Sequence, residues 1–160
     1  MAIVLFRVDE RLIHGQVVVG WGTSLHPQLI VVVDDDLAGA PWEQELYCLG
    51  LPPQLETRFA SVDDARRELP GWQGATTRII VLTRDVRSMR RLLEGLPANR
   101  VEVNIGGIHF APGRRAVLPY VYLSDEERDE MARLAEEGVT ISARDLPSGK
   151  RVDLPQLLGQ

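Results

Sequence analysis

The chain has 160 residues, of which 44% are hydrophobic and 26% are charged, and its net charge at pH 7 is −5. These proportions are ordinary for a globular protein of one domain, and no apolar run approaches the roughly 20 residues that a membrane-spanning helix requires. The acidic total disfavours nucleic acid as the principal partner, and the single cysteine excludes an internal disulfide and argues against a structural metal site.

The chain opens with an apolar run, Ala2 to Phe6, that is typical of a buried strand, and we expect this strand to span Ile3 to Val8. No basic region precedes the run and no small-residue cleavage pattern accompanies it, so the segment does not have the pattern of a secretory signal. We therefore expect a cytoplasmic protein.

A polar turn comes next, and it places one imidazole, two guanidinium groups and two carboxylates between Arg7 and Val17. The stretch from Gln16 to Leu25 favours a helix, so His14 lies where a strand gives way to a helix. In open α/β sheets such a junction lies at the carboxyl edge of the strands, where ligands bind and where the start of a helix offers free N–H groups to anions. A phosphoryl group on His14 would fit this place.

The side chains of the turn suit that chemistry. Arg7 and Arg11 are expected to neutralise an incoming phosphoryl group through bidentate hydrogen bonds, and Asp9 is expected to orient the imidazole or an arginine. Backbone amides at the start of the helix are expected to point at the phosphate, namely those of Gly15, Gln16 and Val17. The residues alone leave open an equal alternative, in which His14 merely caps a surface turn.

Strand-like runs alternate with segments of helix length along the next part of the chain. The expected strands are Leu29 to Val33, Glu56 to Ala60, Arg78 to Leu82 and Val101 to Ile105. Ser61 is expected to cap a short helix that Pro70 and Gly71 stop, and Val86 to Leu96 has the apolar spacing of another helix. This alternation predicts a parallel α/β sheet.

The last third of the chain changes character. The run from Arg115 to Leu123 is expected to be extended, with Pro119 at an edge position. Ser124 begins a capping-box signature, and the helix that it opens is followed by an expected strand from Val139 to Ala143. A short packed helix is expected from Val152 to Leu158. The predicted fold is one α/β domain with an open, twisted, mainly parallel sheet, helices on both faces and antiparallel edge strands in this C-terminal third.

Two further groups of residues follow the ends of expected strands and are candidates to support the polar turn. Asp34 or Asp35 is expected to reach the turn and fix one of its side chains, with a solvated turn or a helix cap as the alternative. Asn104, Gly106 and Gly107 end another strand. Their glycines would let the backbone approach the polar turn closely, and a tight turn forced by topology is the alternative.

Several other residues are weaker candidates. Cys48 lies among apolar residues and is expected in the core rather than as a nucleophile. His109 is expected to pack beside the glycine turn, and His26 to cap a helix end. Gly20 and Gly22 weaken the first helix but permit the close approach of another element. A basic helix start is by default a solvated face, with docking of an acidic partner as the alternative, and it contains Arg84, Arg87, Arg90 and Arg91.

The turn from Arg7 to Val17 resembles the phosphorylation-site loop of the enzyme IIB component of the phosphoenolpyruvate-dependent sugar phosphotransferase system, mannose/fructose/sorbose family. The resemblance extends along nearly the whole chain. Val31 to Ala38 is similar to the segment after the second strand of that family, Asn104 to Phe110 is similar to another of its signatures, and Gly138 to Asp153 fits its closing segment.

The resemblance implies a phosphocarrier in which His14 accepts a phosphoryl group on Nδ1 from a phosphohistidine of a IIA component and delivers it to a sugar entering through membrane components IIC and IID. It implies one IIB domain over residues 1–160, without metal or cofactor, peripherally associated with the membrane transporter. The alternative is a regulatory protein that signals its phosphorylation state without sugar transport. The identity of the sugar is not predicted, and homo-oligomer formation stays open.

Overall fold

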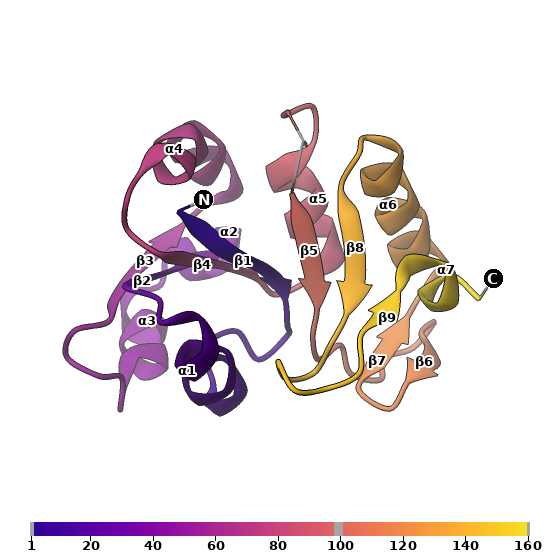
Figure 1. The fold of residues 1–160 in the computed structure, drawn as a ribbon, viewed down its shortest axis with the longest axis horizontal. Helices are drawn as coiled ribbons and strands as arrows, with labels where there is room; N and C mark the ends of the chain where they lie inside the picture. The colour runs from indigo at the N-terminus through magenta and orange to yellow at the C-terminus, as the bar shows by residue number, and fades with distance from the viewer. Residues whose placement is uncertain (1, 98–100, 160) are drawn as a thin grey trace.

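The computed structural model describes residues 2–97 and 101–159, and in them seven strands form one sheet in the order β3-β2-β4-β1-β5-β8-β9 (Figure 1). All neighbours pair in parallel except β9, which pairs antiparallel with β8 at one edge. The bounds are β1 Ile3–Val8, β2 Leu29–Val33, β3 Glu56–Ala60, β4 Ile79–Thr83, β5 Glu102–Ile105, β8 Thr140–Ala143 and β9 Val152–Asp153. The predicted mainly parallel α/β sheet with antiparallel strands near the C-terminus is confirmed.

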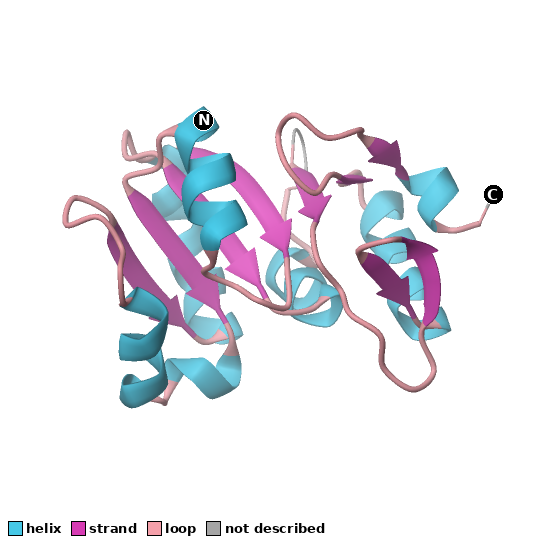
Figure 2. Cartoon of the chain, turned by 90° about the horizontal axis from the view of Figure 1, so that it is seen from below, coloured by secondary structure: helices cyan, strands magenta, loops and turns pink. Residues whose placement is uncertain are grey.

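Helices cover both faces of this sheet, as Figure 2 shows. Their bounds are η1 Gln16–Trp21, α1 Gly22–Leu25, α2 Asp35–Ala38, α3 Pro41–Cys48, α4 Val62–Gly74, α5 Val86–Leu93, α6 Asp125–Glu136 and α7 Leu154–Leu157. Successive side chains of a strand point to opposite faces, so the apolar run of β2 serves two cores. Ile30 and Val32 pack with Val17 of η1 and Leu37 of α2, whereas Val31 packs on the face that α4, α5 and α6 cover.

The helix α4 continues through Pro70 and ends at Gly74, so the prediction that Pro70 and Gly71 stop it is wrong. A proline inside a helix loses one backbone hydrogen bond and disfavours the helical conformation of the residue before it. The helix continues because Trp72, two residues further on, packs against the buried core of that face. Tertiary packing outweighs the local signal here.

The first helix begins at Gln16 as expected, but its first part is a π-helix and only Gly22–Leu25 is α-helical. A Cβ atom on Gly20 would lie 2.6 Å from Cδ2 of Leu146, so the glycine lets the loop after β8 approach this helix closely. The expectation that a glycine admits another element is therefore confirmed at Gly20. His26 ends α1 in the left-handed conformation with φ 50°, which agrees with its expected place at a helix end.

The extended run predicted from Arg115 to Leu123 is divided into two short strands, β6 Arg115–Leu118 and β7 Val121–Leu123, which pair antiparallel as a separate sheet. Pro119 lies in the turn between them and not on an edge strand, because a turn needs no ladder hydrogen bond from that position. The final segment also differs from the expected helix, since Val152–Asp153 forms β9 before α7 begins.

The topology places the polar turn at a switch point of the sheet. After β1 the chain goes to β2 on one side of the sheet, and after β5 it goes to β8 on the other side. Because β1 and β5 are neighbours, the loops that follow them diverge at their carboxyl ends. Open α/β sheets bind ligands at such a place. Figure 1 shows the two arrowheads side by side there.

Candidate functional site

Backbone hydrogen bonds attach the loop after β1 to both neighbouring strands. The Asp9 amide donates to the carbonyl of Thr83 at the end of β4, at 3.0 Å, and the Glu10 amide donates to the carbonyl of Gly107 beyond β5, at 2.9 Å. Leu12 in the same loop has φ 55°, a left-handed conformation that costs an apolar residue about 1 kcal/mol. Complete burial of the Leu12 side chain beside Val17 and Leu37 offsets this cost and fixes the loop.

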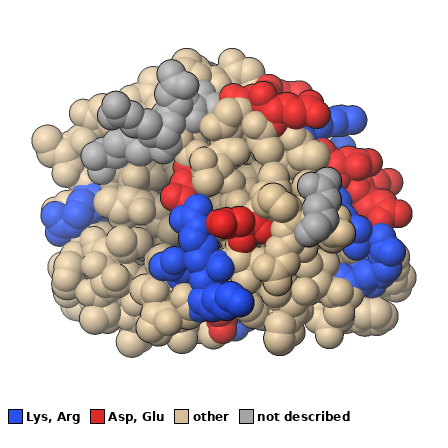
Figure 3. Space-filling model, turned by 45° about the vertical axis from the view of Figure 1, so that its right-hand side comes forward, with Lys and Arg blue, Asp and Glu red and all other residues tan. Residues whose placement is uncertain are grey.

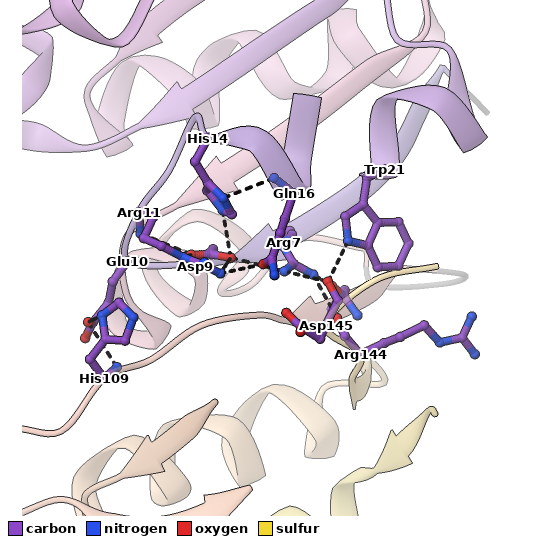
Figure 4. Close-up of polar contacts among 11 residues, drawn as sticks. Arg7, Asp9, Glu10, Arg11, His14, Gln16, Trp21, His109, Arg144 and Asp145 are labelled. Carbon is purple, nitrogen blue, oxygen red and sulfur yellow. Dashed lines mark hydrogen bonds and ion pairs between the residues drawn. The ribbon is translucent and has the colours of Figure 1, made fainter. Parts of the chain in front are cut away.

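The Asp9 carboxylate is the centre of the site, and it is fully buried. Its Oδ2 accepts hydrogen bonds from Arg7 Nη2 at 3.1 Å and from Arg11 Nη2 at 3.2 Å, and it lies 3.1 Å from His14 Nε2. Its Oδ1 accepts from the amide and from Nε of Arg11, at 3.1 and 3.2 Å. Figure 4 shows these side chains converging on Asp9. The expectation that Asp9 orients both the imidazole and an arginine matches this arrangement.

The partners of His14 define its tautomer. An ionised carboxylate only accepts, so the nitrogen facing Asp9, Nε2, carries the proton. The other nitrogen, Nδ1, receives the backbone N–H of Gln16 at 3.3 Å and therefore presents a lone pair. The imidazole is 16% exposed. The site thus offers a nucleophilic Nδ1 beside the start of η1, while the carboxylate holds the opposite edge of the ring.

Arg7 has a different role from the expected one, because its side chain is fully buried. Its four Nη hydrogens are used within the protein: Nη1 donates to Asn104 Oδ1 and to the carbonyl of Arg144, and Nη2 donates to Asp9 Oδ2 and to the carbonyl of Asp145. Its guanidinium also lies 5.4 Å from the centre of the Trp21 ring. The expectation that Arg7 binds the phosphoryl group directly is wrong. Arg7 instead donates to the buried Asp9 carboxylate and holds it in place.

Burial and neighbouring charges have opposite effects on the pKa values of Asp9 and Arg7. Burial raises the pKa of Asp9, but the hydrogen bonds from His14 and Arg11 and the charge of Arg7 lower it more, and the net pKa lies well below the usual range. Burial is also the largest influence on Arg7, where it lowers the pKa against the raising effect of Asp9. Asp9 is therefore an anion at neutral pH, and it is available to stabilise a positive charge on the imidazole.

Arg11 is the arginine that reaches the surface, with 36% of its side chain exposed. Its Nε and Nη2 face Asp9, and Nη2 also donates to Gln16 Oε1 at 2.7 Å. Among the described residues Nη1 has no hydrogen-bond partner. The Nε of Arg7 is also unpaired among these residues but is buried, so of the two arginines in the turn Arg11 is the one that presents unpaired N–H groups at the surface.

Both glycines after β5 make room for these arginines. A Cβ atom on Gly106 would overlap the Arg7 guanidinium and lie 2.6 Å from Asp9 Oδ2. A Cβ atom on Gly107 would lie 3.0 Å from Arg11 Nη2. The prediction that these glycines let the backbone approach the polar turn agrees with the structure, and so does the supporting position of Asn104 beside Arg7.

The backbone amides at the start of η1 are only in part available to a phosphate. The Gln16 amide points at His14 Nδ1. It therefore lies where it would donate to a phosphoryl group bound to that nitrogen. The Val17 amide donates to the carbonyl of His14 at 3.0 Å, so the expectation that it binds phosphate is wrong. This internal bond starts the helix and uses the donor. Gly15 is exposed, and a Cβ atom there would meet nothing within 4 Å.

Asp34 and Asp35 do not contact the polar turn in the described part of the chain. Asp34 caps α2 by accepting from the Leu37 amide at 2.9 Å and forms an ion pair with Arg84 at 3.2 Å. Asp35 accepts from the Val62 amide at 2.9 Å. The expectation of direct site contact is corrected to the alternative of a helix cap, because β4 separates β2 from β1 in the sheet.

The weaker candidates are also placed. Cys48 is half-buried beside Thr57, with 3.3 Å between Sγ and Oγ1, and it lies at the end of α3 outside the fully buried core. His109 is exposed and not packed; its Nδ1 lies 3.0 Å from Glu10 Oε2. Among the four arginines of the basic helix start, ion pairs involve Arg84, Arg90 and Arg91. These pairs reduce the positive surface that the sequence suggested.

Sequence reasoning did not find the supporting contacts that come from the loop after β8. The carbonyls of Arg144 and Asp145 accept from Arg7, and the Asp145 carbonyl also accepts from Trp21 Nε1 at 3.1 Å. A backbone carbonyl leaves no signal in the identity of its residue. The ion pair between Glu10 and Arg114, 104 positions apart, was missed because neither residue forms a recognisable motif with the other.

A hollow of about 340 Å³ lies next to Arg11 and extends the site along the surface; it is lined by Glu10, Arg11, Arg84, Asp85, His109 and Arg114. Both signs of charge line this hollow. Figure 3 likewise shows basic side chains beside acidic ones on the face that it displays. On that face a strip of basic side chains is flanked by acidic ones.

Within residues 2–97 and 101–159, no three His, Cys, Asp or Glu side chains are grouped so that they would hold a metal ion. In the same described ranges no helix has the length and apolar character to cross a membrane.

Comparison with known proteins gives consistent matches. The family model described as the PTS system sorbose subfamily IIB component matches residues 3–160. The chain is 29% identical over 156 residues to the N-acetylgalactosamine-specific phosphotransferase enzyme IIB component 1 of Escherichia coli, with 96% of each chain covered. It is 30% identical over 161 residues to the fructose-specific EIIB component of Bacillus subtilis, covering 99% of this chain and 96% of that one.

Longer relatives and solved structures add to these matches. The chain is 26% identical to the mannose-specific EIIAB component of Escherichia coli and covers 49% of its length. The crystal structure of an N-acetylgalactosamine IIB component from Streptococcus pyogenes superposes with a TM-score of 0.86 at 26% identity, covering 97% of this chain and 96% of that one. The matches by sequence and the match by structure are thus all to proteins that are described as IIB components or that include one.

Proposed function

The chain belongs to the sorbose-subfamily IIB components of the phosphotransferase system, and from that premise we propose that His14 is the residue that carries the phosphoryl group. A IIB component is a phosphocarrier in sugar uptake. What supports His14 in that role is the geometry of its ring: Nε2 faces Asp9 at 3.1 Å, and Nδ1 is left with a lone pair beside the first amides of η1. This arrangement of the ring is the observation that carries the proposal.

In the first step the lone pair of His14 Nδ1 attacks the phosphorus of a phosphohistidine on the IIA component. The new N–P bond forms as the N–P bond of the donor breaks, and the electron pair of that bond returns to the donor imidazole. The transition state is loose and in line, so the protein contributes positioning and charge stabilisation. His14 keeps its Nε2 proton and becomes a positively charged phosphoimidazolium.

The positive charge on the phosphorylated ring explains the buried Asp9. The carboxylate lies against the Nε2–H and stabilises the imidazolium, as in other histidine–carboxylate pairs. Arg7 prevents Asp9 from being an isolated buried charge, while Arg11 and the Gln16 amide are the donors that meet the phosphoryl oxygens. Asp9, Arg11 and Gln16 therefore act at the reacting group, Arg7 acts through Asp9, and Asn104 acts through Arg7.

In the second step a sugar hydroxyl oxygen attacks the phosphorus. Its proton passes to solvent, the N–P bond breaks, and the electron pair returns to His14 Nδ1. The mannose-specific EIIAB relative includes a IIA part by name, and the chain spans about half of that relative's length, 49%. We accordingly assign a IIA component as the phosphoryl donor and membrane components IIC and IID as the partners that present the sugar.

The partners require a site open to two proteins in turn, and the ring of His14, 16% exposed, lies in a surface loop. We place the protein at the cytoplasmic side of the membrane transporter, bound peripherally, with residues 1–160 acting as one IIB domain. The regulatory alternative, in which the protein only signals its phosphorylation state, is favoured by no contact among the described residues. Formation of a homo-oligomer is not part of the proposal.

The test is to supply radiolabelled phosphoenolpyruvate with enzyme I, the general phosphocarrier protein and the cognate IIA component. We expect acid-labile label on the wild-type chain and none on the His14→Ala variant. A His26→Asn variant is the matched control, because it removes an imidazole far from the site and asparagine tolerates the left-handed conformation there. Label that persists in His14→Ala would exclude His14 as the acceptor.

A further inference from the structure

Gln16 contacts both of the groups that a phosphoryl group on His14 must meet. Its backbone N–H points at His14 Nδ1, at 3.3 Å, and its side-chain Oε1 accepts from Arg11 Nη2, at 2.7 Å. One residue therefore connects the nucleophilic atom with the part-exposed arginine of the turn, whose Nη1 has no partner among the described residues. Figure 4 shows Gln16 beside His14, with a dashed line that joins it to the imidazole.

The Arg11 guanidinium is held on three sides. Its Nε and Nη2 face the two oxygens of Asp9, at 3.2 Å each, and the backbone of Gly107 passes close enough that a Cβ atom there would lie 3.0 Å from Nη2. Gln16 supplies the remaining contact. Both hydrogens of Nη2 and the one on Nε are then used, and the unpaired N–H groups of the guanidinium are those of Nη1.

Rigid placement of Arg11 is of value because its side chain is 36% exposed. An exposed arginine loses side-chain entropy when it is ordered, and ordering that is complete before the reaction does not add to the barrier. An amide suits this restraint better than a carboxylate, since it accepts the same hydrogen bond without adding a negative charge beside an incoming phosphoryl group.

We propose that the Gln16 side chain is a positioning residue that holds the Arg11 guanidinium ready for the phosphoryl group on His14, a role separate from that of the Gln16 backbone amide. This inference rests on the proposed function. Gln16 acts through Arg11, so its side chain contributes only while Arg11 is present.

The experiment is a double-mutant cycle with Gln16→Met, Arg11→Met and the combined variant. Methionine keeps the length of the glutamine side chain and removes its oxygen, and the backbone amide stays in place. With phosphorylated IIA as donor, we expect kcat for phosphoryl transfer to fall about tenfold in Gln16→Met, the size expected for one hydrogen bond to a charged group, with KM unchanged. In the Arg11→Met background Gln16→Met causes no further loss.

Equal losses from Gln16→Met in both backgrounds, or no loss in either, would overturn the inference. The lifetime of isolated phosphorylated protein is a second readout, and it needs no partner: we expect faster hydrolysis of the phosphohistidine in Arg11→Met, a change in Gln16→Met that is no larger, and no further change when the two are combined. Gln54→Met, an exposed residue between α3 and β3, is the matched control. Thermal unfolding midpoints show whether each variant is folded.

The outcomes separate the two proposals. If label persists in His14→Ala, the proposed function fails whatever Gln16 does. If His14 is the acceptor and Gln16→Met transfers phosphate like the wild type, only the positioning role is wrong.

Discussion

Nε2 of His14 lies 3.1 Å from Oδ2 of Asp9, and this contact determines which nitrogen of the imidazole is free to react. The carboxylate can only accept, so the proton stays on Nε2 and the lone pair on Nδ1. In Asp9→Asn the side-chain amide would bring one acceptor and two donors among groups that all donate. We expect phosphoryl transfer to fall on the order of a hundredfold, measured as the rate of labelling by phosphorylated IIA.

The same carboxylate makes a prediction about acid stability. The pKa of Asp9 is lower in the folded protein than in the unfolded chain, where it is about 3.9. The folded state therefore favours the anion, and its contribution to stability is complete above that unfolded pKa and is lost as the pH falls toward the lowered one. Urea unfolding of wild type and Asp9→Asn should differ most near neutral pH and converge below about pH 4.

If the two unfolding curves stay equally far apart at acid pH, Asp9 is not the group responsible. The control is Asp125→Asn, whose carboxylate is 85% exposed and pairs only at the surface. Its stability difference from the wild type should be small at every pH, because exposed ion pairs contribute little.

The two arginines of the turn should separate stability from activity. Arg7→Met leaves the Asp9 charge buried with one partner fewer, and we expect a loss of about 3–5 kcal/mol in the free energy of unfolding. Arg11→Met removes a side chain that is 36% exposed, so water can take its place beside Asp9; it should cost less stability than Arg7→Met, yet it should slow phosphoryl transfer strongly. Urea titration gives the first quantity and transfer kinetics the second. A reversed order of the two losses in stability would contradict these roles.

Much of this site follows from the sequence, and the remainder depends on long-range geometry. The turn from Arg7 to Val17 identified His14, Asp9 and Arg11, because a strand followed by a helix has a known carboxyl edge. The burial of Arg7 and the partial exposure of Arg11 were not predictable from their spacing in the sequence. Arg7 is in β1 and is buried by Asn104 and by carbonyls 137 and 138 positions away, and no local pattern encodes such contacts.

In the fold, too, local features were predictable from the sequence and features that depend on distant residues were not. Alternating apolar strands and helices predicted the parallel sheet, since both signals are local. The helix through Pro70 was not predicted, because it depends on the packing of Trp72 against a core built by distant residues. Their place after a buried strand predicts that Asp34 or Asp35 reaches the site, but the order of the strands puts β4 between β2 and β1.

The two glycines after β5 should differ in their tolerance of a methyl group. In Gly106→Ala the new Cβ overlaps the buried Arg7 guanidinium and Asp9, neither of which has room to move, and overpacking of this kind typically costs about 1–3 kcal/mol. In Gly107→Ala the Cβ meets the part-exposed Arg11, which has space to shift. We expect Gly106→Ala to lower the unfolding midpoint and Gly107→Ala to leave it nearly unchanged while slowing transfer. Equal destabilisation by both would contradict this account of the site.

Arg84 offers a test of how the IIA component approaches. It lines the hollow of about 340 Å³ beside Arg11, its side chain is 39% exposed, and Asp34 holds it at 3.2 Å. Charges at the rim of a transient interface mainly affect the association rate, because they act before the partners touch. In Arg84→Ala we therefore expect a higher KM for phosphorylated IIA and an unchanged kcat.

Salt distinguishes this explanation from a local structural effect. Exposed charges are screened over about 8 Å at physiological ionic strength and over shorter distances in concentrated salt, so the difference in KM between Arg84→Ala and wild type should shrink as salt is added. Arg67, which is 71% exposed on α4 and pairs with Asp64, supplies the control Arg67→Ala, for which no change in KM is expected. A fall in kcat for Arg84→Ala at all salt concentrations would instead place Arg84 at the reacting group.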